Sequence, residues 1–341
     1  MKVIPVDCNY VEPNFACSYF LLQELQGNRS GFFVECNTNY AIPYLQAAAE
    51  KEGLTPDQVE GLIITHVHLD HAGGAGLFLK TFPKAKVYAH PRAAKHLIHP
   101  EKLIASATAV YGATFMEKVY GTILPCPAER VVILEDHDLV QWHNVTLNTH
   151  HTRGHANHHL CVVLPESSSN KLTVFTGDSF GVSYPQLSRE PKGATLGVKK
   201  QRVILASTSP TDFDGKAALE TVKWIESVHQ QSKNGARIGL THYGWIEPDE
   251  VIPAARALER SIQFSMDLIE TEIKINEAGV TDASREPLTL EQCRAKLEQW
   301  LVNDCEAAGI RLTPQDLKLL SVDLTVNAQG LLFQIQKASQ K

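Results

Sequence analysis

A short stretch of metal-binding side chains places the strongest constraint on what this chain can fold into. Residues 62–65 form a β-branched apolar run, typical of a strand buried on both faces. Four candidate ligands follow within six residues: His66, His68, Asp70 and His71. The chain has 15 histidines, so a pair would arise by chance, but four ligands at the end of a buried strand favour a metal site. Imidazole and carboxylate together suit zinc, iron or manganese.

The spacing His-x-His-x-Asp-His resembles the first motif of the metallo-β-lactamase superfamily. Three later segments resemble the further ligand motifs of that family and occur in the same order. The segment 149–159 contains His155, with Arg153 where the family usually has proline. The other two segments each carry a ligand at the end of an apolar strand: Asp178 in 174–179 and His242 in 238–244.

The resemblance implies an α/β fold, an αββα metallo-β-lactamase-type sandwich, that holds two divalent transition-metal ions. These ions are zinc, or alternatively iron or manganese. By the family's geometry one ion is held by three histidines: His66, His68 and His155. The other ion is held by Asp70, His71 and His242, and Asp178 bridges the two. The resemblance also implies a metal-bridging hydroxide as nucleophile, with Asp70 as the predicted catalytic residue.

Strand and helix patterns alternate along most of the chain, which suits a layered α/β arrangement. We predict a catalytic domain over residues 1–248, with a helical insertion at about 98–122, and a helical C-terminal extension over 249–341. The extension begins with an amphipathic helix whose apolar residues recur at steps of three and four: Val251, Ala255, Leu258, Ile262, Met266, Ile269 and Ile273.

Local patterns predict several individual elements. Two strands, at 18–25 and 31–36, flank a Gly/Asn turn and form a hairpin. Residues 105–120 have the composition of one helix. Thr289 and Thr313 are predicted to cap two helices of the extension.

Composition and charge predict the cellular compartment of the protein and the kind of partner it binds. A formal charge of −6 and a pI near 6.2 give no reason to expect nucleic acid or an anionic membrane as partner. We find no apolar run of membrane-spanning length and no apolar signal-peptide core at the N-terminus. Seven cysteines, an odd number, favour reduced thiols. We therefore predict a cytoplasmic protein with a small-molecule substrate; homo-oligomerisation through the helical extension is left open.

A competing motif occurs at residues 177–181, where Gly-Asp-Ser-Phe-Gly matches the nucleophile elbow of serine hydrolases. That elbow requires a helix directly after the nucleophile, here Ser179. The prolines at 185 and 191 break helices instead. A serine mechanism would also leave the metal ligands without a role, so we reject this interpretation.

Three function classes remain. The first is a dinuclear hydrolase that resembles the glyoxalase II-like branch and acts on a thioester or ester. The second is a diiron redox or oxygen-binding protein, whose relatives usually have Glu at the position of His68. The third is a low-turnover sensor or interaction protein on the same fold. The complete ligand set favours the hydrolase, because a decayed site should have lost at least one ligand.

Aromatic side chains are predicted to line the substrate pocket. They come from the insertion, from the loop 180–202 and from the position after His242: Tyr111, Phe115, Phe180, Tyr184 and Tyr243. For Tyr243, packing in the core is an equal alternative. Apolar walls suit an acyl chain better than a phosphodiester, which calls for a Lys/Arg groove. His159 is predicted to orient a ligand from outside the coordination sphere.

Overall fold

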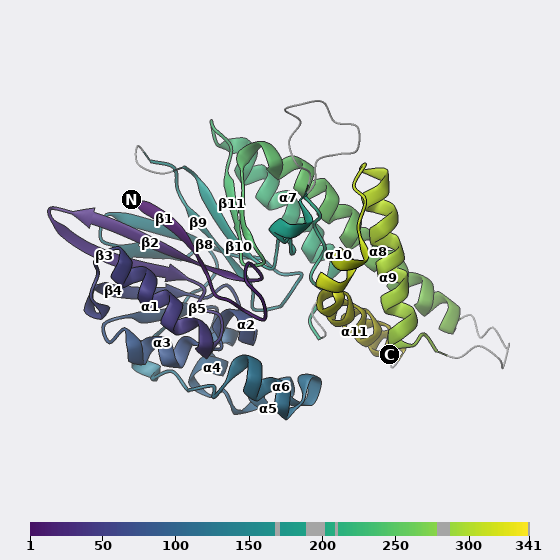
Figure 1. Ribbon diagram of the computed structural model, residues 1–341, viewed down its shortest axis with the longest axis horizontal. Coiled ribbons are helices and arrows are strands. Elements are labelled where there is room, and N and C mark those ends of the chain that lie inside the picture. Colours follow the sequence, from purple (N-terminus) through teal and green to yellow (C-terminus); the bar gives the residue numbers. More distant parts are fainter. Residues whose placement is uncertain (168–170, 189–201, 209–210, 278–286, 340–341) are drawn as a thin grey trace. The chain divides into compact units, whose positions relative to one another are not determined.

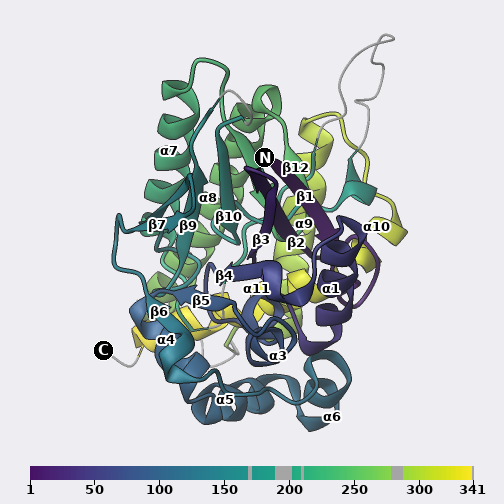
Figure 2. The same ribbon diagram turned by 90° about the vertical axis from the view of Figure 1, so that its left-hand side faces the viewer.

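The structure is a computed structural model that describes residues 1–167, 171–188, 202–208, 211–277 and 287–339 (Figures 1 and 2). The chain divides into two compact units. The first comprises Met1–Thr152, His158–Asp178 and Ser227–Val251. The second comprises Arg153–Asn157, Ser179–Glu226 and Ile252–Lys341. This division differs from a single boundary at residue 248, because two internal segments group with the C-terminal helices. The middle of the predicted loop, residues 189–201, lies outside the described residues.

The first unit contains a six-stranded sheet in strand order β1 to β6. Its strands are β1 (Lys2–Asp7), β2 (Cys17–Leu25), β3 (Asn28–Val34), β4 (Val59–Ile63), β5 (Lys86–Ala89) and β6 (Val131–Ile133). Strands β1 to β3 are antiparallel and β3 to β6 are parallel. The predicted hairpin is confirmed as β2 and β3. The second strand ends at Val34 rather than at 36, because Glu35 turns to a φ of 69°.

Both faces of this sheet are buried. Alternate side chains such as Phe33 and Leu62 pack against helices α1 (Ile42–Lys51), α3 (Ala75–Thr81) and α4 (Pro91–Ile98). The intervening side chains, among them Phe32 and Ile63, belong to a second core cluster. The two-residue period of a strand thus explains the continuous apolar runs in the sequence.

A second six-stranded sheet of the first unit forms the other side of that core cluster. Its strands run in the order β12 to β7: β12 (Gly244–Ile246), β11 (Arg237–Leu240), β10 (Thr173–Gly177), β9 (Leu160–Leu164), β8 (Val145–His151) and β7 (Leu139–Trp142). Only β10 and β11 pair in parallel; the other pairs are antiparallel. The inner faces of the two sheets meet through side chains such as Tyr19, Leu147 and Phe175.

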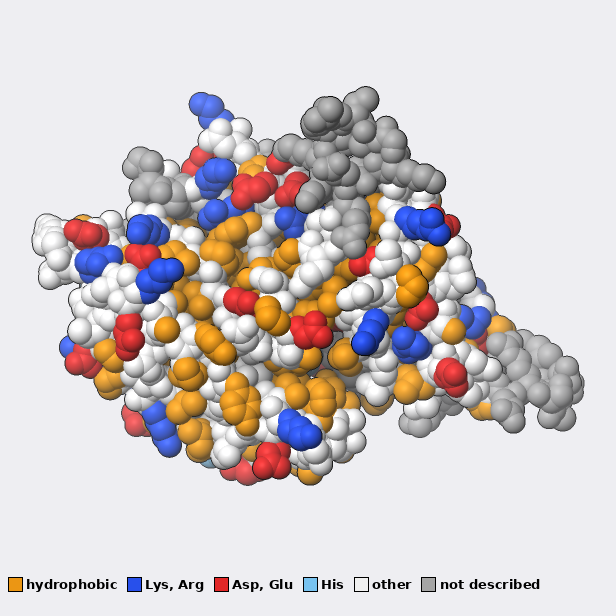
Figure 3. Space-filling view, in the orientation of Figure 1, with side chains coloured by type: hydrophobic (Ala, Val, Ile, Leu, Met, Phe, Trp, Pro, Cys, Tyr) orange, Lys and Arg blue, Asp and Glu red, His pale blue; other side chains and the backbone are white. Residues whose placement is uncertain are grey.

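The segment predicted as a helical insertion is helical, but the single helix expected over 105–120 is wrong. The segment forms α5 (Glu101–Tyr111), α6 (Ala113–Phe115) and a π-helical turn (Met116–Tyr120). Gly112 separates them at a φ of 81°, a conformation that ends an α-helix. Apolar side chains reach the surface over the helices at the lower left of Figure 3; the exposed ones in the first unit include Tyr40, Tyr44, Val110 and Tyr111.

The second unit is helical. Beyond the first part of α7 (Gly215–Gln231) it contains α8 (Val251–Glu277), α9 (Leu290–Ala307), α10 (Pro314–Leu319) and α11 (Ser321–Ser339). Thr289 and Thr313 begin helices as predicted: each side chain accepts a backbone N–H of the first turn. Of the predicted stripe on α8, the residues up to Ile262 are buried, whereas Met266, Ile269 and Ile273 are half-buried and line a cavity of about 830 Å³.

The observed architecture confirms the predicted fold class, an α/β protein of two sheets and helices with a helical C-terminal region. Among the described residues, no helix combines the length and the apolar character that crossing a membrane requires. All seven cysteines are buried and free, as expected for reduced thiols.

Candidate metal centre

The carboxyl ends of two parallel strand pairs carry the polar residues of the site. Strands β3 and β4 are neighbours, and Glu35 and His66 follow them closely. Strands β10 and β11 are neighbours in the other sheet, and Asp178 and His242 follow them. Parallel neighbours end at the same edge of a sheet, so each pair brings together residues that are far apart in the sequence.

The turn after β4 supplies three histidines in little space. A single helical turn, α2 (Leu69–Ala72), begins directly after His68 and carries Asp70 and His71 back toward the strand end. The ring centroids of His66 and His68 are 4.4 Å apart, and those of His66 and His71 are 4.0 Å apart. The predicted strand end followed by a turn is therefore confirmed.

His71 lies between two carboxylates. Its Nδ1 is 3.4 Å from Glu35 Oε2 and its Nε2 is 3.2 Å from Asp178 Oδ1, and the ring is fully buried. Burial by itself would lower the pKa of His71, but Asp178 and Glu35 outweigh it and raise that pKa well above its usual value. Within the described part of the chain, neither ring nitrogen makes a hydrogen bond of good geometry. A ligand nitrogen that faces an ion would show this arrangement.

His242 provides the clearest test of whether the site fits a metal. Its Nδ1 donates a hydrogen bond to the carbonyl oxygen of Phe15 at 2.8 Å, so in the neutral ring Nε2 carries a lone pair. That Nε2 is 3.4 Å from Asp70 Oδ2 and 3.8 Å from Asp178 Oδ1. A lone pair directed at two carboxylates is repulsive unless a proton on Nε2 or a bound metal ion lies between them. The donor set therefore fits divalent transition-metal ions.

In the metal-free protein, protons on the histidines supply part of the positive charge between the carboxylates. Burial would lower the pKa of His242, but Asp178 and Asp70 raise it to about 8. For Asp70, burial would raise the pKa, but His71 and His242 lower it to about 2. Both shifts show that the site is built for positive charge between its carboxylates.

Two further residues hold Asp178 in place. The backbone N–H of Asp178 donates to His159 Nε2 at 3.3 Å, and His159 Nδ1 is 2.9 Å from the Thr152 hydroxyl. Both ring nitrogens of His159 thus contact protein groups, which agrees with its predicted orienting role. Gly177 is required here, since a Cβ on it would lie 2.3 Å from Thr65 Oγ1 and 2.7 Å from His159 Nε2.

Glu35 is the principal residue that the sequence analysis missed. It is 1% exposed, and its Oε1 accepts the backbone N–H of Thr65 at 3.1 Å while Oε2 faces His71. Glu35 was assigned to the interior of the strand predicted over 31–36, so it was not considered as a site residue. Its position at the end of a strand next to the one that precedes His66 could have indicated its role.

Glu35→Gln is expected to weaken metal binding by roughly tenfold to a hundredfold, the range for outer-sphere partners of metal ligands. The amide N–H₂ would point a donor at His71 Nδ1, which favours the tautomer with the proton on Nε2, the nitrogen that faces Asp178. Competition with a chromophoric chelator measures the affinity. Glu60→Gln, at the surface beside His143, is the matched control, and equal affinities in the two variants would contradict this role.

The predicted ligand His155 lies in the segment Arg153–Asn157 of the second unit. It is 5% exposed, and its Nδ1 is 2.9 Å from the carbonyl oxygen of Ser207, also in the second unit. The first unit itself brings together the other six predicted ligands: His66, His68, Asp70, His71, Asp178 and His242. The role of His155 stays a prediction.

Aromatic side chains of the first unit lead from the insertion to the site. Tyr111 stacks on Phe115, and the Tyr120 ring lies 6.1 Å from that of Tyr111. The hydroxyl of Tyr120 is 3.2 Å from that of Tyr10, whose ring centroid lies 6.3 Å from that of His242. Tyr111 and Phe115 are predicted from the sequence, whereas Tyr10 and Tyr120 are not, because no motif marks them.

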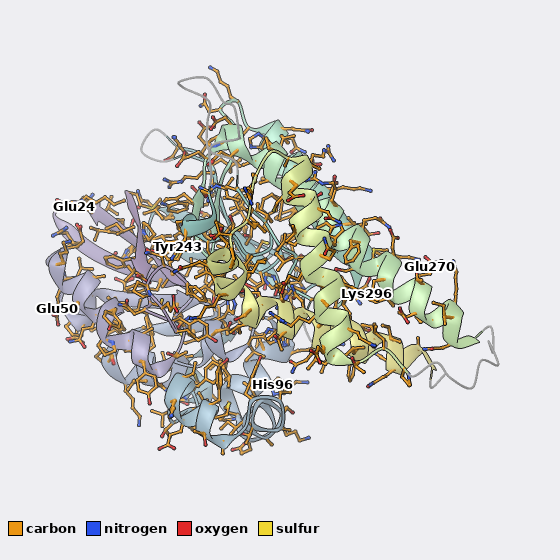
Figure 4. All side chains as sticks on the ribbon, turned by 45° about the vertical axis from the view of Figure 1, so that its right-hand side comes forward. Glu24, Glu50, His96, Tyr243, Glu270 and Lys296 are labelled. Carbon is orange, nitrogen blue, oxygen red and sulfur yellow. The ribbon has the colours of Figure 1, made fainter. Side chains whose placement is uncertain are left out.

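The remaining proposed pocket residues are Phe180, Tyr184 and Tyr243, and a pocket role for the first two stays a prediction. Phe180 and Tyr184 are buried in the second unit, where the Tyr184 hydroxyl donates to Asp323 at 3.0 Å. Tyr243 packs against the core cluster between the sheets, the second of its two predicted placements (Figure 4). After Ser179 the described chain forms only a short 3-10 turn at Pro185–Leu187, so the helix of a serine nucleophile elbow is absent from residues 180–188.

Comparison with known proteins assigns the fold. Residues 36–198 match the model of the "Metallo-beta-lactamase superfamily". A solved structure described as an archaeal metallo-beta-lactamase superfamily protein from Sulfolobus tokodaii aligns with a TM-score of 0.58 at 20% identity, over 97% of this chain and 98% of the other. The fold is the metallo-β-lactamase fold.

Sequence relatives agree with this metallo-β-lactamase fold. A metallo-beta-lactamase fold-containing protein of Sulfurisphaera tokodaii is 24% identical over 228 residues, 66% of this chain and 73% of the relative. A hydroxyacylglutathione hydrolase of Aeromonas salmonicida is 27% identical over 103 residues, 30% of this chain and 28% of the relative.

Proposed function

We propose that this chain is a dinuclear metal-dependent hydrolase of the metallo-β-lactamase superfamily that acts on a thioester or ester. The observation that carries the proposal is the orientation of His242, whose Nδ1 is tied to Phe15 while Nε2 faces Asp70 and Asp178. This arrangement supports a cation between the imidazole and the carboxylates.

Two ligand sets make up the proposed centre. His66, His68 and His155 form the first, Asp70, His71 and His242 form the second, and Asp178 lies between them. Support comes from two groups of ligand atoms in the first unit, each within 4.8 Å: His66 with His71 and Asp178, and Asp70 with His71 and His242. For His155 the support is the sequence resemblance of residues 149–159 to the family's second ligand motif.

When bound, the two metals would supply a water of lowered pKa and polarise the substrate carbonyl. The protein's own residues prepare the site for this. Glu35 orients His71, and His159 orients Asp178. Burial together with the nearby Asp70 raises the pKa of Tyr10 and brings that of Tyr111 to about 12. These phenols therefore keep their protons and can donate hydrogen bonds to substrate oxygens.

The chemistry of the leaving group favours thioesters over amides. An amide nitrogen must be protonated before it leaves, and the described tyrosines beside Asp70 hold their protons too tightly to serve as that acid. A thiolate leaves without protonation, because a thiol has a pKa of about 8.5. The aromatic wall from Phe115 to Tyr10 is suited to an acyl chain. The glyoxalase II-like branch is part of the proposal, supported by the relative that is named a hydroxyacylglutathione hydrolase.

A small-molecule substrate and a cytoplasmic location complete the proposal. The formal net charge of −6 supports a partner that is not a polyanion.

The test is a panel of acyl-thioesters, esters, lactones and phosphodiesters, assayed with the zinc-, manganese- and iron-loaded protein. Thioester or ester turnover is expected, with a rate that rises with pH through about 7. Phosphodiester turnover without hydrolysis of any acyl substrate would contradict the proposed reaction class. Oxygen consumption by the iron-loaded protein without hydrolysis would favour the diiron alternative.

A further inference from the structure

A second group of histidine and carboxylate side chains lies in the first unit, apart from the residues of the candidate metal centre. Asp136 and His137 sit in the turn before β7, and His150 lies on β8. His150 Nδ1 is 3.3 Å from His137 Nδ1 and 3.4 Å from Asp136 Oδ1. We propose that these three residues form a peripheral binding site for a divalent transition-metal ion.

Two of the separations between these atoms match those that a metal requires. One ligand atom from each of the three residues lies within 4.8 Å of the other two. Ligands at about 2.0 to 2.2 Å from a tetrahedral zinc ion are about 3.3 to 3.6 Å apart. The distances from His150 to His137 and Asp136 fall in that range. Without an ion, His150 and His137 share a hydrogen bond between their Nδ1 atoms, and an ion bound there would replace it.

The fold holds the carboxylate in position before any ion binds. The backbone N–H of His151 donates to Asp136 Oδ1 at 2.7 Å, which ties the turn to the strand that carries His150. Asp136 Oδ2 remains 3.5 Å from His137 Nε2. An ion would therefore find a preorganised carboxylate beside an imidazole on a strand, and the ordering cost of binding is reduced.

Charge and protonation also favour a cation. Glu135 and Asp138 flank Asp136 and His137 in the sequence and add negative charge to this turn. Partial burial lowers the pKa of His150, against the opposing effect of Asp136, so the imidazole keeps a lone pair at neutral pH. Partial burial opposes the ionisation of Asp136, but the N–H of His151 outweighs it and lowers that pKa.

The exposure of the group distinguishes it from the buried centre. The side chain of His137 is 72% exposed, that of Asp136 44% and that of His150 23%. Solvent would fill the remaining coordination positions, so the ion exchanges freely. Imidazole and carboxylate ligands suit Zn²⁺, Ni²⁺ and Cu²⁺, and disfavour Mg²⁺ and Ca²⁺.

Calorimetric titration of the tag-free, zinc-loaded protein with Zn²⁺ tests the site. Because the same ion already fills the catalytic centre, exchange there is silent, and one additional site per chain is expected. Asp136→Asn and His137→Asn should each lower its affinity by at least about tenfold. Asparagine suits both positions, since it still accepts the His151 N–H and tolerates the φ of 65° at His137.

His143→Asn is the matched control: this exposed histidine follows β7 and pairs with Glu60, outside the proposed site, and asparagine tolerates its φ of 51°. It should retain the additional site, and all three variants should retain the hydrolytic activity of the loaded protein. In NMR spectra of the imidazoles, Zn²⁺ should shift the signals of His137 and His150 but not that of His143. An additional site that persists unchanged in Asp136→Asn and His137→Asn would overturn the proposal, as would its absence from the unmodified protein.

Discussion

Asp178→Ala is expected to abolish hydrolysis, with a loss greater than the roughly hundredfold upper range for outer-sphere partners. Asp178 Oδ1 lies 3.2 Å from His71 Nε2 and 3.8 Å from His242 Nε2, so the carboxylate faces two of the proposed ligands at once. Its removal would leave these imidazoles without the negative charge between them. Turnover and metal content measured on the same sample give the result, and the metal content should fall with the activity.

Ser179→Ala is the control for this experiment, because Ser179 is the neighbouring residue and the nucleophile of the rejected serine mechanism. It should retain most of the activity and all of the metal. Equal loss of activity in both variants, with metal retained, would instead support a serine hydrolase. Asp178→Asn adds a variant of nearly unchanged shape that removes only the charge.

Metal removal is expected to have the second large effect. Dialysis against a chelator should abolish turnover, and Zn²⁺, Mn²⁺ or Fe²⁺ should restore it. The melting temperature should fall by several degrees, because an ion present at about a hundred times its dissociation constant stabilises the folded state by about 2.7 kcal/mol. Elemental analysis of the reloaded protein should find about two ions per chain. Full activity in the chelator-treated, metal-free protein would contradict the proposed function.

The metal-free protein should also show a characteristic dependence of stability on pH. The carboxylates of Asp178 and Asp70 raise the pKa of His242 from 6.5 to about 8 in the folded state. Because the pKa of His242 is higher in the folded state, its protonation stabilises the folded protein. This stabilisation is complete below the pKa of the unfolded chain and is lost as the pH rises through about 8. This shift corresponds to about 2 kcal/mol. Between pH 6 and 9 the melting temperature of the metal-free protein should fall, and that of the zinc-bound protein should fall less.

Several features of the protein followed from sequence because they are local. The strand before His66 and the turn after it are set by a β-branched run and by the residues that follow directly. The caps at Thr289 and Thr313 depend on an interaction that spans three residues. The single helix expected over 105–120 failed for an equally local reason, because the φ of Gly112 outweighed the helical composition around it.

The sequence by itself determined the order and chemical type of the candidate ligands, because these depend on residue identity and spacing. Only the tertiary structure decided what surrounds them. Glu35, Phe15 and Tyr10 reach the site from other parts of the first unit, and nothing in their local sequence marks them. Phe180 and Tyr184 are buried in the second unit, and their predicted role in the pocket stays a prediction. The physical reason is that side-chain packing depends on which strands become neighbours, and strand pairing is a property of the whole chain.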